Sequence, residues 1–163
     1  MRRQVLSLLV ENNPGVTSHI SGLFSRRGYN IDSFSSGVTA DPRYTRITIV
    51  ASGDEQILEQ IEKQLNKKLD VIKVKTLSQE QCYTRELMLL KVKYNKNNRR
   101  DIIEICDIMK TEIVDMSKHF MMLQICDSPE KIDTLIKMLQ SISIVEVART
   151  GTLALSKCAE NDD

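Results

Sequence analysis

Hydrophobic residues in the first half of the chain alternate between the spacing of strands and the spacing of helices. A continuous apolar run over residues 4–10 predicts a strand, which stops at the loop ENNPG. Behind that loop, apolar side chains recur at helical spacing, and the predicted helix ends where a basic pair precedes Gly28, a glycine suited to a left-handed C-cap. The apolar positions of this helix are Val16, Ile20, Leu23 and Phe24.

Two strands, a second helix and a further strand follow. Residues 31–38 and 44–51 are predicted to be strands on either side of the turn TADPR. Residues 54–70 place apolar side chains on one helical face, with acids at the front and lysines at the back, and VIKVKT supplies the next strand. The predicted order of elements is therefore βαββαβ.

The same order begins again after a polar segment without periodicity. This segment, residues 78–85, is predicted to be a linker. Beyond it, the apolar spacing indicates a strand, a helix, two short strands across the turn SKH, a helix opened by Pro129, and two closing strands. These elements are predicted at residues 87–94, 100–110, 112–116, 120–126, 129–140, 144–148 and 152–155.

The repeated pattern predicts an α+β protein. We expect two ferredoxin-like βαββαβ sandwiches in tandem, each with its helices on one face of an antiparallel sheet. The first domain is expected over residues 1–77, the linker over 78–85, the second domain over 86–157, and a disordered tail over 158–163.

Composition places the chain among soluble globular proteins. Of its 163 residues 41% are hydrophobic, and 23 lysines and arginines nearly balance 22 acidic residues, so neither a membrane nor nucleic acid is an expected partner. The first apolar run is short and no cleavage site follows it, so it is not predicted to be a signal peptide. Four cysteines without a Cys-x-x-Cys pair favour neither a metal nor a redox site, and they fit a reducing cytoplasm.

Residues that could perform catalysis are scarce. His19 falls within the first predicted helix and His119 in a turn, and no motif places a nucleophile or carboxylate to activate either, so both are expected to be structural or solvated. No glycine-rich nucleotide-binding motif is present. An enzyme is therefore not expected. A ferredoxin-like enzyme of the acylphosphatase type is the alternative from that class, and it would need an arginine in the ENNPG loop.

The basic segment KNNRRD, residues 96–101, raises a second alternative, because RNA-recognition modules share the βαββαβ plan. Those modules stack bases on aromatic side chains of their central strands. The corresponding strands of the first domain hold only Tyr44, at one end. A solvated helix start is therefore the simpler interpretation of this segment.

The loop ENNPG, between the first strand and the first helix, is the best candidate for binding. Gly15 lets a ligand approach the backbone, and the helix that begins near Val16 aims unpaired N–H groups into the loop. One carboxylate would match these groups, and the amide oxygens of Asn12 and Asn13 could accept from an ammonium group, which suits a free amino acid. From the residues alone, an ordinary turn capped by asparagine remains the simpler alternative.

Several segments together resemble a known family. The opening MRRQVLSLLVENNPGVTSHISGLFSRRGYNIDSFSSG resembles the ACT domain of the small, regulatory subunit of acetohydroxyacid synthase, also called acetolactate synthase. The resemblance continues through TRITIV, GDEQILEQIEKQLNKKLDVIKV, RELMLLKV and IVEVARTG, and so covers nearly the whole chain.

The resemblance implies a regulatory subunit without catalysis of its own. It would form a homodimer through its ACT domains and bind the large catalytic subunit, which would hold the cofactors thiamine diphosphate, magnesium and FAD. It would activate that subunit and confer feedback inhibition by valine or another branched-chain amino acid. The effector would bind between two chains, at Asn12, Gly15 and Val16 of one chain and at Asn30 and Ile31 of the other.

The predicted topology fits a dimer of this kind. In a βαββαβ sheet the second strand lies at an edge, so residues 31–38 must be covered or paired. Pairing with the same strand of a second copy would give a continuous sheet across a two-fold axis.

Overall fold

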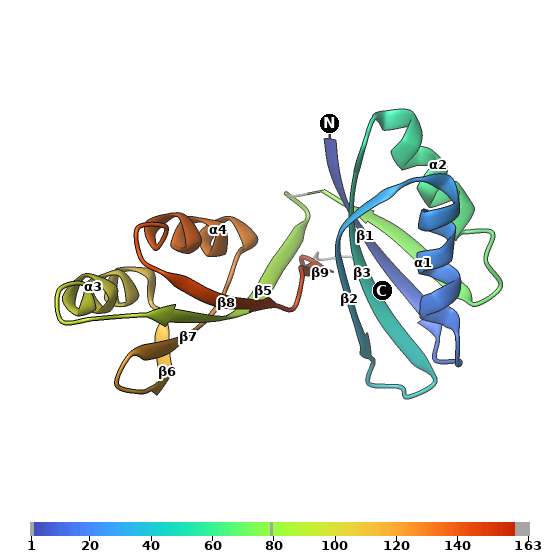
Figure 1. Ribbon diagram of the computed structural model, residues 1–163. Helices are drawn as coiled ribbons and strands as arrows, with labels where there is room; N and C mark the ends of the chain where they lie inside the picture. Colours follow the sequence, from blue (N-terminus) through green and yellow to red (C-terminus); the bar gives the residue numbers. More distant parts are fainter. Residues whose placement is uncertain (1, 79, 159–163) are drawn as a thin grey trace. The chain divides into compact units, whose positions relative to one another are not determined.

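The structure, a computed structural model, describes residues 2–78 and 80–158. The chain divides into two compact units (Figure 1). Unit 1 is Met1–Tyr83 together with the segment that begins at Thr152, and unit 2 is Thr84–Gly151. Each unit has two helices on one face of an antiparallel sheet. The predicted α+β fold class is therefore confirmed.

Unit 1 has the predicted order βαββαβ. Its elements are β1 (Arg2–Glu11), α1 (Val16–Arg27), β2 (Asn30–Val38), β3 (Tyr44–Gly53), α2 (Glu55–Leu65) and β4 (Val71–Leu77). The four strands lie in the order β2-β3-β1-β4, and every neighbouring pair is antiparallel. The second strand, β2, is thus at an edge of the sheet, as predicted.

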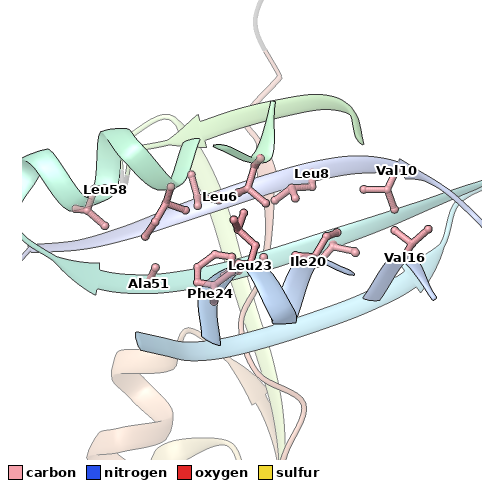
Figure 2. Close-up of a cluster of buried hydrophobic side chains, with 13 residues drawn as sticks. Leu6, Leu8, Val10, Val16, Ile20, Leu23, Phe24, Ala51 and Leu58 are labelled. Carbon is pink, nitrogen blue, oxygen red and sulfur yellow. The ribbon is translucent and has the colours of Figure 1, made fainter. Parts of the chain in front are cut away.

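The core of unit 1 lies between this sheet and its two helices (Figure 2). Alternate residues of β1 and β3 point to the helices, because side chains along a strand alternate between its two faces. The helices contribute the apolar residues that their spacing predicted. The core includes Leu6, Leu8, Val10, Ile20, Phe24, Ile47, Ile49, Ile61 and Leu65, each 0 or 1% exposed.

Unit 2 repeats the plan around a second core. Its elements are β5 (Cys82–Lys93), whose first two residues belong to unit 1, α3 (Arg99–Met109), β6 (Glu112–Met116), β7 (Phe120–Asp127), α4 (Pro129–Met138) and β8 (Ile144–Arg149). The strands lie in the order β6-β7-β5-β8. Alternate residues of the central strands, among them Met88, Leu90, Met121 and Leu123, pack against α3 and α4.

The boundary between the units differs from the sequence prediction at residues 78–85. Strand β5 begins at Cys82, inside the predicted linker. Cys82 is only 5% exposed and packs with Leu77 and Ala154, with Val5 alongside. Among the described residues of 78–85, Cys82 alone is buried, so the sequence has no apolar run there that would indicate the start of a strand.

The end of the chain also differs from the prediction, which placed residues 152–157 in the second domain. Strand β9 (Leu153–Ser156) pairs with β5, and the segment from Thr152 belongs to unit 1. The Thr152 N–H donates to the Ser33 hydroxyl at 2.7 Å, and the Lys157 N–H donates to the Gln81 carbonyl at 2.8 Å. The disordered tail predicted at 158–163 lies outside the described residues, except for Cys158, which is exposed.

Candidate functional site

The loop between β1 and α1 leaves the first turn of the helix open. Gly15 is the N-cap residue, and its φ of 88° lies in the left-handed region that favours glycine. No side chain caps the helix, and its first turn has no acidic residue. The N-terminus of α1 therefore keeps the partial positive charge and the N–H groups that attract an anion.

The two asparagines of the loop are held by the chain itself. The Asn12 side-chain amide donates to the Pro42 carbonyl at 2.9 Å, and its oxygen accepts from the Thr45 hydroxyl at 3.0 Å. The Asn13 amide donates to the Glu11 carboxylate at 2.8 Å. Because an amide oxygen has two lone pairs, Asn12 retains one acceptor position for a ligand ammonium group.

Val16 can contribute only its backbone to a ligand. Its side chain is 5% exposed and belongs to the core of unit 1. Its N–H donates to the Asn13 carbonyl at a long 3.4 Å. This geometry leaves the backbone of the loop, rather than any side chain at position 16, to face a ligand.

The residues predicted for the other half of the site, Asn30 and Ile31, open strand β2. The Asn30 amide donates to the Asp32 carboxylate at 2.7 Å. Asp32 also accepts from the Ser52 hydroxyl and lies 3.3 Å from the Arg3 guanidinium. Asn30 is exposed, whereas Ile31 is half-buried against the core.

The two halves of the predicted site lie at opposite ends of the sheet. Glu11, just before the loop, pairs with Tyr44 at the start of β3, whereas Asn30 pairs with Ser52 near its end. These positions on β3 are about 26 Å apart at about 3.3 Å per residue. One chain therefore does not bring the five predicted residues together, and the opposite end of β2, Val38, is the end that lies beside Thr45 and the loop.

A histidine that the sequence interpretation treated as structural or solvated lies beside the loop. The Nδ1 atom of His19 is 3.4 Å from a carboxylate oxygen of Asp70. The Cε1 and Nε2 atoms of the same ring are each 3.9 Å from the position that a Cβ at Gly15 would take. The spacing from Gly15 to His19, one helical turn, was the only sequence signal, since Asp70 is remote in the chain.

The residues that the structure describes offer no metal site. Within them, no group of histidine, cysteine and acidic side chains is arranged to hold a metal ion. Burial, with a smaller effect of Asp107, raises the pKa of the Cys106 thiol to about 11, so it stays protonated at neutral pH. No helix in residues 2–78 and 80–158 is long and apolar enough to cross a membrane.

Two motifs of unit 2 meet in an ion pair whose carboxylate is buried. Arg149, from IVEVARTG, donates through Nε and Nη2 to both carboxylate oxygens of Glu86, from RELMLLKV, at 2.7 and 2.9 Å. Its Nη1 donates to Asp133 of α4 at 2.9 Å. Glu86 is 4% exposed, and the hydrogen bonds from Arg149 raise the pKa of the guanidinium. This network links β5 and β8 to α4 and so has a structural role.

Sequence comparison matches two families that together span most of the chain. Residues 6–73 match the family described as "AHAS small subunit-like ACT domain", and residues 85–158 match "Small subunit of acetolactate synthase".

Individual relatives match over nearly their full length. The chain is 42% identical to a probable acetolactate synthase small subunit of Methanothermobacter thermautotrophicus, over 94% of this chain and 92% of that protein. It is 40% identical to the acetolactate synthase isozyme 3 small subunit of Salmonella typhimurium, over 95% and 96%. A crystal structure of the acetolactate synthase small subunit from Thermotoga maritima superposes with a TM-score of 0.89, at 33% identity, and covers 98% of this chain and 99% of that one.

Proposed function

Because this chain belongs to the family of acetolactate synthase small subunits, we propose that it binds the large catalytic subunit, raises its activity, and confers feedback inhibition by valine or another branched-chain amino acid. The chain is a regulatory subunit with an ACT domain. In this proposal the chain holds no cofactor, and thiamine diphosphate, magnesium and FAD belong to the large subunit.

The observation that carries the effector-binding proposal is the position of the two half-sites at opposite ends of one sheet. Within the described residues, β2 pairs only with β3, so its outer edge is free to pair with a second copy. Antiparallel pairing of β2 with its copy across a two-fold axis would set the partner's Asn30 beside Val38. Val38 is next to Thr45, which is hydrogen-bonded to Asn12. A homodimer would therefore complete two equivalent sites.

The groups at such a site match the three parts of a branched-chain amino acid. The N-terminus of α1 at Gly15 would bind the carboxylate, and the remaining lone pair of Asn12 would accept from the ammonium group. Val38, which is 60% exposed, offers an apolar contact for the branched side chain.

An effector bound between the two chains of the dimer would regulate a distant active site only if two dimer arrangements bind the effector unequally. A tenfold difference in affinity corresponds to about 1.4 kcal/mol. Two sites in each dimer would double that bias, which is enough to change the activity of the complex several-fold.

The test compares Gly15→Asp with Gly15→Asn in the complex with the large subunit. Both side chains tolerate a positive φ better than other residues do, so the two variants share the same backbone strain. Only aspartate puts a negative charge where the effector carboxylate would bind. In Gly15→Asp, we expect the valine concentration that gives half-maximal inhibition to rise more than tenfold. Gly15→Asn should retain most of the wild-type inhibition. Full valine inhibition of the Gly15→Asp complex would show that the site is elsewhere.

A further inference from the structure

His19 lies between a carboxylate and the effector loop. Its Nδ1 atom is 3.4 Å from a carboxylate oxygen of Asp70. Its Cε1 and Nε2 atoms face Gly15, each 3.9 Å from the position that a Cβ at Gly15 would take. The Asp70 side chain is 29% exposed, and the Asp70 carbonyl accepts from the Glu11 N–H at 2.9 Å, so the residue is fixed at the end of the sheet. The His19 side chain is 65% exposed, which leaves its outer edge open to a ligand.

We propose that His19 is a further effector-binding residue, oriented by Asp70, whose protonated imidazole donates from Nε2 to the effector carboxylate. This inference rests on the proposed function, because it assumes that a carboxylate binds at Gly15. When Nδ1–H points to Asp70, a neutral ring presents a lone pair at Nε2, whereas a protonated ring presents an N–H. While Nδ1–H donates to Asp70, only the protonated ring can also donate from Nε2 to the effector carboxylate.

The other charged groups around this loop do not change charge in the range where an imidazole does. They include Glu11 at the end of β1, Asp70 before β4, and the ion pair of Arg43 with Asp41 in the turn before β3. Carboxylates, lysines and arginines generally keep one charge state between about pH 6 and pH 8. Effector binding should therefore take up a proton in this range and weaken as pH rises.

The test is calorimetric titration of the full chain with valine at several pH values, in two buffers that differ in their heat of ionisation. We expect the wild type to bind valine about threefold more weakly at about pH 8 than at about pH 6, because the His19 charge is partly screened by solvent. His19→Gln should abolish both the pH dependence and the proton uptake. Asp70→Asn, which removes the orienting partner, should weaken valine binding at about pH 6.

Two further variants make the result specific. His19→Arg keeps a permanent charge, so it should bind valine at about pH 8 as tightly as the wild type does at about pH 6, without pH dependence. His119→Gln removes the chain's other histidine, which lies in unit 2, and should leave the wild-type pH dependence unchanged.

The outcomes separate the two proposals. If the wild type binds valine but His19→Gln keeps the same pH dependence and proton uptake, the role of His19 is overturned and effector binding stands. If the wild type binds neither valine, leucine nor isoleucine at any pH, with or without the large subunit, the proposed effector binding fails and this inference fails with it.

Discussion

Units 1 and 2 repeat one order of elements, yet their first strand-to-helix loops use their asparagines differently. In unit 1, the Asn12 side chain is hydrogen-bonded to the Pro42 carbonyl and the Thr45 hydroxyl, and no side chain caps helix α1 at Gly15. In unit 2, the Asn95 oxygen accepts from the N–H groups of Asn97 and Asn98 at 2.8 and 3.1 Å. The Asn95 side chain thus accepts hydrogen bonds from two backbone N–H groups of its own loop.

The difference teaches that this fold does not by itself provide a ligand site. Neither α1 nor α3 has a side-chain cap, but α3 has Asp101 in its first turn, whereas α1 has no acid there. An acid near a helix N-terminus partly neutralises the charge that would attract an anion. The N-terminus of α1 is therefore better suited than that of α3 to bind an anion.

The largest difference in stability between the two units is expected from Arg149→Met. The change leaves the buried Glu86 carboxylate without its partner, and we expect a loss of about 3 kcal/mol in the stability of unit 2, measured by urea unfolding. The control Lys63→Met breaks an exposed ion pair with Glu59 on α2 and should cost less than about 0.5 kcal/mol.

Thiol labelling of the two buried cysteines reports which unit unfolds in the Arg149→Met variant. Cys82 packs within unit 1 and Cys106 within the core of unit 2, so each is protected from thiol reagents while its unit is folded. In Arg149→Met, we expect Cys106 to be labelled faster while Cys82 keeps its wild-type rate. Equal acceleration of both would mean that the two units unfold together.

A smaller effect is expected from removing one asparagine from each loop. Asn95→Ala removes an acceptor of two backbone N–H groups and should lower stability by about 1 kcal/mol. Asn13→Ala removes only an exposed bond to Glu11 and should change stability by less than about 0.5 kcal/mol. Thermal unfolding of both variants measures the difference, and a larger loss for Asn13→Ala would contradict the proposed contrast between the loops.

The sequence predicted well where periodicity is local and less well where distant residues meet. The first six elements of the chain follow from apolar spacing and glycine positions, since burial of one face is decided within each element. The start of β5 at Cys82 was missed because its burial depends on Ala154, far along the chain. The strand β9 was predicted, but its place in unit 1 was not, because it depends on long-range bonds such as that from Thr152 to Ser33.

The candidate site shows the same limit. Gly15 could be recognised from sequence because a strand, a loop and a helix start are adjacent there. The contact of His19 with Asp70 could not, because it depends on the backbone bond from Glu11 to Asp70, which joins the end of β1 to the approach to β4. The five predicted effector residues remain predictions, and one chain places them at opposite ends of its first sheet.

The smallest expected effect concerns two ion pairs, each formed by residues four positions apart in the chain, one in each unit. In unit 2, the Lys131 ammonium lies 2.7 Å from Asp127, and its hydrogen bond is the main cause that lowers the pKa of that carboxyl. A carboxyl with a lowered pKa in the folded state stabilises the fold above its unfolded pKa, and this stabilisation is lost as pH falls through the folded pKa. Lys131→Met should therefore flatten the acid side of the stability curve below about pH 4, by about 0.5 kcal/mol because both side chains are about one-third exposed.

The unit 1 pair of Lys63 with Glu59 is the matched comparison. Its atoms are 3.3 Å apart and both side chains are more than half exposed, so water already screens the interaction. We expect Lys63→Met to leave the acid side of the curve unchanged, measured by urea midpoints at several pH values below neutral. If both variants flattened the curve equally, the shorter distance and greater burial of the unit 2 pair would not be what sets its strength. If only Lys131→Met does so, closeness and burial decide which of two similar sequence pairs contributes to stability.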